Sequence, residues 1–125
     1  MRLLLDTHVV LWCFENSRRL KPSVRQAITH GSNQVYVSAV TPWELIIKTA
    51  LGKIQMPDDF ESQLRSCGFA TLPIQVKHAL RIRALPELHR DPFDRMLIAQ
   101  AIAEDLTLVS HDAAVWQYDV SLLKA

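Results

Sequence analysis

Short apolar runs alternate along this chain with longer segments of helical periodicity, and this alternation restricts the fold more than any other feature. The first run ends in three leucines and is closed by Asp6, a pattern typical of a strand buried on both faces of a parallel sheet. Pro73 weakens one of the later runs as a strand. We expect five strands: Arg2–Leu5, Gln34–Ser38, Ala70–Ile74, Thr107–Ser110 and a last one near Val120–Leu122.

The segments between these runs carry helix signals, with proline at their starts and glycine after their ends. The most regular one opens with Asp91-Pro92 and continues to Ala103. The other expected helices are Val9–Glu15, Lys21–His30, Thr41 to about Leu51, Asp58–Cys67, Gln75–Leu85 and a short turn at Ala113–Trp116. Strands that alternate with helices predict one α/β domain over residues 1–125, most simply a parallel sheet covered by helices on both faces.

The composition suits a single globular domain with its own core. The chain has 125 residues, 49% of them hydrophobic, and shows no repeat, linker or low-complexity tract. A chain of this length buries roughly two thirds of its unfolded surface, so it needs no disulfide or metal to fold. Its net charge of +1 creates no global field for nucleic acid, so any such site must come from local segregation of charge.

The two cysteines and the N-terminus carry no targeting or metal signal. Cys13 and Cys67 lack a CxxC spacing, and we interpret both as reduced, buried packing residues. The opening MRLLL is interrupted by Asp6 and His8 before it is long enough for a signal peptide, and no apolar stretch reaches the length of a membrane span. We therefore expect a cytoplasmic protein that does not bind membranes.

Acidic side chains follow the predicted strands where a functional crevice is expected. Asp6 ends the first strand and Asp112 follows the Thr107–Ser110 strand, while Glu44 and Asp94 lie in the first turns of helices. Ligands of open α/β sheets bind beyond the carboxyl ends of the strands. Clustered like charges are costly unless a cation lies among them or one of them is protonated. Carboxylates suit Mg²⁺ or Mn²⁺, and no cysteine or histidine cluster favours zinc.

Each of these carboxylates also has a structural explanation. Glu44 completes a possible capping box with Thr41, whose backbone N–H its carboxylate would reach. Three others can cap helices or complement helix dipoles: Asp91, Asp94 and Asp112. Asp6 is the hardest to explain in this way, because a charge at the end of a buried strand is rarely buried unless it is paired or bound to metal. The joint pattern, and no single residue, carries the inference.

Four stretches of the chain resemble PIN-domain proteins in order and spacing, most of all the VapC-like toxins of bacterial toxin–antitoxin pairs. They are LLLDTHVVLW, VSAVTPWELIIKTALGKI, HRDPFDRMLIAQA and TLVSHDAAVWQY, and they span nearly the whole chain. The resemblance implies a three-layer α/β/α PIN-like domain with a central, mainly parallel sheet. It places the family's metal-binding acidic set on Asp6, Glu44, Asp94 and Asp112, with Asp91 and Thr7 as possible accessory residues.

The resemblance also implies an activity and partners. It implies an endoribonuclease that depends on Mg²⁺ or Mn²⁺, usually a homodimer, which a cognate VapB-like antitoxin neutralises. In our mechanistic hypothesis, Asp6 and Asp94 hold the principal ion, and Asp112 and Glu44 complete its shell, hold a second ion or orient the attacking water. No protein nucleophile is then required.

An acidic crevice repels RNA unless basic residues at its rim contact the phosphates. Arg95 is the first candidate for a phosphate contact because it neighbours Asp94. The further candidates are Arg18, Arg19, Lys21, Arg25, Lys48, Lys53 and Arg90, each of which can equally belong to a solvated face. The scattered histidines, among them His8, His78, His89 and His111, form no ligand pattern.

Other functions fit the residues less well. A phosphatase of the haloacid dehalogenase type needs a second aspartate two residues after the first, where His8 stands, and a phospho-receiver domain needs an adjacent acidic pair. Two alternatives stay open: a non-catalytic α/β module that binds RNA or protein, and a PIN nuclease without an antitoxin. Apolar residues of the Glu44 helix could form a partner groove or pack in the core: Trp43, Ile46, Ile47 and Leu51.

Overall fold

Five parallel strands form the centre of the protein. The computed structural model describes all 125 residues. The strands are β1 (Arg2–Leu5), β2 (Gln34–Ser38), β3 (Ala70–Leu72), β4 (Thr107–Ser110) and β5 (Leu122–Lys124), in the spatial order β3-β2-β1-β4-β5. β1 therefore lies in the middle, with Leu5 opposite Val37 of β2 and Val109 of β4.

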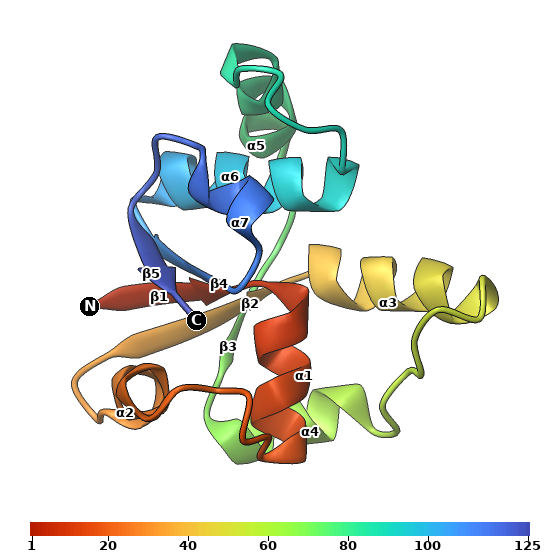
Figure 1. The fold of residues 1–125 in the computed structure, drawn as a ribbon, viewed down its shortest axis with the longest axis vertical. Coiled ribbons are helices and arrows are strands. Elements are labelled where there is room, and N and C mark those ends of the chain that lie inside the picture. The colour runs from red at the N-terminus through yellow and green to blue at the C-terminus, as the bar shows by residue number, and fades with distance from the viewer.

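Helices cover both faces of this sheet, as the sequence predicted. Figure 1 shows α6 and α7 against one face and α1, α2 and α4 against the other, while α3 extends outward from the end of β2. The bounds are α1 (Thr7–Glu15), α2 (Pro22–Thr29), α3 (Val40–Ala50), α4 (Phe60–Cys67), α5 (Val76–Arg81), the 3₁₀ turn η1 (Ile82–Ala84), α6 (Pro92–Glu104) and α7 (Ala113–Trp116). The predicted three-layer α/β/α arrangement with a parallel sheet is confirmed.

The alternation of side chains along β1 divides the core into two layers. Leu3 and Leu5 pack in the cluster on the α1, α2 and α4 side, whereas Leu4 packs on the α6 side with Ile98. All three leucines are fully buried because β1 is covered on both faces. The carboxyl end of β1, and with it Asp6, is thereby held in the middle of one sheet edge.

Several element boundaries differ from the predicted ones; strand pairing explains one of them, and a local hydrogen bond accompanies another. The final strand lies at Leu122–Lys124 instead of Val120–Leu122, because its register is set by pairing with β4. The helix expected from Thr41 begins at Val40, and the Ser38 hydroxyl accepts the Val40 amide at 3.0 Å. Thr41 thus lies inside α3, so the predicted capping box with Glu44 is wrong.

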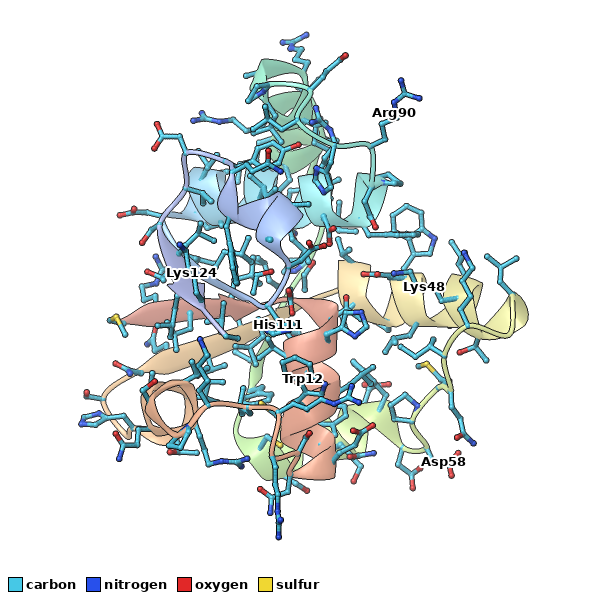
Figure 2. The ribbon with its side chains drawn as sticks, in the orientation of Figure 1. Trp12, Lys48, Asp58, Arg90, His111 and Lys124 are labelled. Atoms are coloured by element: carbon cyan, nitrogen blue, oxygen red, sulfur yellow. The ribbon has the colours of Figure 1, made fainter.

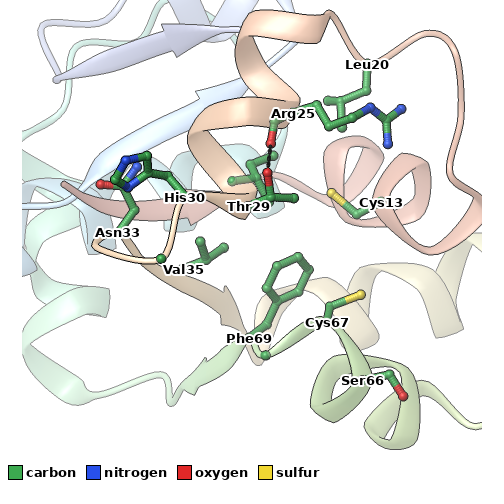
Figure 3. A pocket seen from close by; sticks show the side chains of 13 residues that line it. Cys13, Leu20, Arg25, Thr29, His30, Asn33, Val35, Ser66, Cys67 and Phe69 are labelled. Carbon is green, nitrogen blue, oxygen red and sulfur yellow. Dashed lines mark hydrogen bonds between the residues drawn. The ribbon is translucent and has the colours of Figure 1, made fainter.

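The burial predicted for the cysteines is also wrong for one of them. Cys67, the last residue of α4, is exposed, and Cys13 is half-buried. Both line a hollow of about 480 Å³ between α2 and α4, together with Arg25 (Figure 3). Burial raises the pKa of the Cys13 thiol to about 12, so this thiol stays protonated and unreactive. None of the helices combines the length and the apolar character that crossing a bilayer requires.

Candidate active site

Three predicted site residues lie at helix N-termini along the carboxyl edge of the sheet. Asp6 caps α1, with its Oδ1 accepting the Val9 amide at 3.0 Å, and Asp112 caps α7 by accepting the Ala114 amide at 2.9 Å. Asp91 caps α6 through the amides of Phe93 and Asp94, at 2.9 and 3.1 Å. In each case the amides bind Oδ1, so capping leaves the second carboxylate oxygen available for other chemistry.

Asp6 is the most deeply buried of these caps, with 5% of its surface exposed. Burial raises the pKa of the Asp6 carboxyl, while hydrogen bonds from the Ser110 hydroxyl and the Val9 and His111 amides, and the charge of His8, act to lower it. The carboxylate is therefore buried at the junction of β1, β4 and α1. No lysine or arginine contributes to this balance.

Asp94 lies in the first turn of α6, and the charges of the other carboxylates at this edge act on its pKa. Burial, the largest cause, and the charges of Asp91, Glu44, Asp112 and Asp6, in that order, together raise the pKa of Asp94 to about 8. Carboxylates from β1, α3, α6 and the end of β4 therefore share one electrostatic environment, as the sequence analysis expected. Their side chains do not form a closed ligand shell, since no three acidic, histidine or cysteine side chains are grouped to hold an ion as they stand.

Glu44 is already bonded on both of its carboxylate oxygens. Its Oε1 accepts the Thr7 hydroxyl at 2.6 Å, and its Oε2 pairs with the Lys48 ammonium one turn along α3. Only 3% of Glu44 is exposed. The Thr7 hydroxyl also lies 3.4 Å from that of Thr41, so α1 and α3 are joined at this point. Glu44 is thus fixed in place beside the other carboxylates and does not cap its own helix.

A second network holds Asp94 from the side of α7. His89 lies between Asp94 and Tyr118. Its Nε2 is 3.3 Å from Asp94 Oδ2, and its Nδ1 is 2.7 Å from the Tyr118 hydroxyl. Arg95 donates to the same hydroxyl at 2.9 Å and to the Pro86 carbonyl at 2.8 Å. The sequence alone does not connect His89 with Asp94, because His89 lies in an irregular loop that no periodicity places.

The basic candidates divide into bonded and free side chains. Arg95 is bonded as above, and Arg25 donates to Asn16 Oδ1 and to the Ser17 carbonyl, so both have partners within the fold. Arg19 is exposed and its guanidinium makes no hydrogen bond or ion pair. Arg90 extends away from the loop that precedes α6, whereas Lys48 lies along α3 (Figure 2).

Known proteins that resemble this chain show the family to which its fold belongs. The sequence profile of the PIN domain matches residues 3–120. This chain belongs to the PIN-domain family. A PIN-domain relative, Ribonuclease VapC22 of Mycobacterium tuberculosis (strain ATCC 25618 / H37Rv), is 32% identical over 113 residues, which cover 88% of this chain and 86% of that protein.

Solved structures share the fold of this chain. The chain is similar to one in the crystal structure of VapBC2 from Rickettsia felis bound to a DNA fragment from their promoter, with a TM-score of 0.73 and 18% identity over 100% of this chain and 99% of that one. It is likewise similar to a chain of DNA-bound VapBC from Salmonella typhimurium, with a TM-score of 0.68 and 18% identity over 99% and 98%. At such identities the likeness shows the shared fold.

Proposed function

We propose that this PIN-domain protein is a metal-dependent endoribonuclease that hydrolyses RNA phosphodiester bonds, and that it is the toxin of a toxin–antitoxin pair. The observation that carries the proposal is the gathering of Asp6, Glu44, Asp94 and Asp112 at one sheet edge, where burial and the charges of the neighbouring carboxylates raise the pKa of Asp94 to about 8. The relative named as a ribonuclease and the similar VapBC structures support the activity and the pairing.

The residues at this edge fit a divalent cation. Their donors are hard carboxylate oxygens, which Mg²⁺ and Mn²⁺ prefer. The repulsion that holds Asp94 protonated is relieved when a cation lies among the carboxylates, since a nearby positive charge favours ionised carboxyl groups. The Lys48 ammonium does not supply this positive charge to Asp94, because it pairs with Glu44.

The bonding of each carboxylate assigns it a role in this proposal. Asp6, Asp94 and Asp112 each have an oxygen left after capping or after the His89 contact, so these three would hold the ion. Glu44, bonded to Thr7 and Lys48, is better suited to orient the attacking water. A bound ion supplies a Lewis acid for the scissile phosphate and lowers the pKa of the water. The N-termini of α1 and α6 add favourable partial charges for a phosphate.

Cleavage of RNA by the purified, antitoxin-free protein tests the proposal. Total cellular RNA is incubated with Mg²⁺ or Mn²⁺, with EDTA, and with an Asp6→Asn variant. Asparagine caps helices as well as aspartate does, so the variant keeps the α1 cap and loses only the charge. We expect cutting that requires the metal and is lost in Asp6→Asn. Full activity in that folded variant, or no cutting by wild type under any condition, contradicts the proposal.

Protein partners form part of the same proposal. We infer a cognate VapB-like antitoxin, and a homodimer as the working form, because α3 exposes a run of large apolar side chains. Exposed fractions there are 48% for Trp43, 59% for Ile46, 37% for Ile47 and 63% for Leu51. Core packing therefore does not account for these residues. A molar mass measured by light scattering checks the dimer, and a monomer at micromolar concentration contradicts it.

A further inference from the structure

An open hollow of about 480 Å³ lies beside the acidic edge and takes no part in the proposed chemistry. Four residues line it: His8, Trp12, Arg19 and His111. They come from α1, from the loop after α1 and from the loop after β4, so three separate segments meet there. No acidic residue lines the hollow, in contrast to the edge next to it.

Aromatic rings make up most of the lining. Trp12 is only 7% exposed, and the His111 ring lies edge-on to its indole with centroids 5.0 Å apart at 67° (Figure 2). The His8 ring also lies near the indole, with centroids 6.5 Å apart and a tilt of 39°. Trp12 therefore forms a rigid floor, while both imidazoles stay exposed. Unstacked RNA bases stack on rings of this kind.

The polar groups of the hollow are those that a nucleotide needs. His111 Nδ1 donates to the Ala125 carbonyl at 2.7 Å, which fixes the ring and leaves Nε2 as a free acceptor for an amino group or a 2′-hydroxyl. The Arg19 guanidinium has no partner within the fold. An arginine with all its donors free suits a phosphate, whose oxygens it can bind in pairs.

Two residues of the hollow, His8 and His111, adjoin residues of the acidic edge. His8 follows Asp6 by two residues, and the backbone amide of His111 is one of the groups that act on the Asp6 carboxyl. Asp112 comes directly after His111. A nucleotide in the hollow is thus a neighbour of any phosphate held at Asp6.

We propose that this hollow binds the nucleotide adjacent to the scissile phosphate, with its base against His8 and His111 and its phosphate on Arg19. The inference rests on the proposed ribonuclease function and adds to it the residues that select the RNA. An acidic edge alone repels RNA, and a cationic, aromatic hollow beside it holds the strand there.

Binding of labelled RNA tests this without requiring cleavage. Fluorescence anisotropy measures the affinity of Asp6→Asn protein for fluorescein-labelled 12-nucleotide oligo(A), oligo(C) and oligo(U), and for an abasic ribose-phosphate oligomer of equal length. Arg19→Ala and His8→Ala are added in turn. Both side chains are exposed and without hydrogen-bond partners, so neither change should affect folding.

We expect Arg19→Ala to weaken binding of every oligomer, and His8→Ala to weaken at least one base-bearing oligomer about fivefold or more while leaving the abasic one unchanged. Arg65→Ala, which removes the same charge from exposed α4, is the matched control and should have little effect.

Equal losses in Arg19→Ala and Arg65→Ala, or no base-dependent loss in His8→Ala, overturn the proposed hollow. The cleavage assay on wild type tests the nuclease separately. If wild type cuts RNA but the two arginine variants lose affinity equally, only the proposed hollow is refuted. If wild type does not cut RNA, the proposed nuclease activity is refuted, whatever the anisotropy shows.

Discussion

The buried hydrogen bond from Thr7 to Glu44 is the contact on which the geometry of the acidic edge depends most. Thr7 is 3% exposed and its hydroxyl lies 2.6 Å from Glu44 Oε1. Thr7→Val keeps the shape and removes the donor, which leaves a buried carboxylate oxygen without its partner. We expect the free energy of unfolding to fall by about 1–3 kcal/mol. Urea unfolding measures it, with Thr7→Ser as the control that keeps the hydroxyl; equal losses in both variants contradict this role.

The raised pKa of Asp94 predicts how the stability of the metal-free protein depends on pH. Burial and the neighbouring carboxylates raise this pKa from its usual 3.8 to about 8. The folded state therefore keeps a proton that the unfolded state releases, so the free energy of unfolding falls as pH rises through this range. Stability should be higher at pH 5 than at pH 8 in EDTA.

Asp94→Asn isolates this effect, because asparagine does not titrate and all histidines stay in place. Urea unfolding of the variant should show a flatter dependence on pH than wild type. Two results would contradict this account: wild type that is more stable at pH 8 than at pH 5, or a variant whose free energy of unfolding depends on pH as steeply as that of wild type. Either result would mean that Asp94 is not protonated in the folded protein.

At the scale of the element, two substitutions of Asp91, the cap of α6, distinguish a structural role of this residue from a catalytic one. Asp91 accepts two amides through Oδ1. Asp91→Ala should cost about 1 kcal/mol of stability, whereas Asp91→Asn keeps the cap and removes only the charge. We expect Asp91→Asn to cleave RNA as wild type does. A loss of cleavage as complete as that in Asp6→Asn would instead place Asp91 among the metal ligands.

The elements also show what could be predicted from the sequence. β1, β2 and β4 lie at the predicted residues, because buried parallel strands carry a strong local pattern. The start of α3 does not, since the helix begins at Val40, whose amide donates to the Ser38 hydroxyl, one residue before the predicted start at Thr41. Local signals located the four carboxylates at the edge. They could not show that Thr7 binds Glu44, because only tertiary packing brings α1 and α3 together, or that His89 reaches Asp94 from an irregular loop.

At the scale of the whole molecule, sheet order explains why distant carboxylates meet. β1 is central and β4 is its neighbour, so Asp6 and the loop that carries Asp112 leave the sheet side by side. Both core layers pack against β1, so the strand that ends at Asp6 is supported from both faces of the sheet. Similar chains keep the fold at 18% identity, with a TM-score of 0.73 in one of them. The pattern of buried strands and covering helices, more than residue identity, therefore maintains the fold.

Mn²⁺ binding by the isolated protein tests most directly whether these carboxylates form one metal site, since it requires no knowledge of the RNA. Calorimetric titrations at pH 7 in buffers of different ionisation enthalpy give both the affinity and the protons released. With the pKa of Asp94 at about 8, binding by wild type should release protons, and Asp94→Asn should bind at least about tenfold more weakly and release fewer. Absent binding, or equal affinity and proton release in the two proteins, contradicts a metal site at the acidic edge.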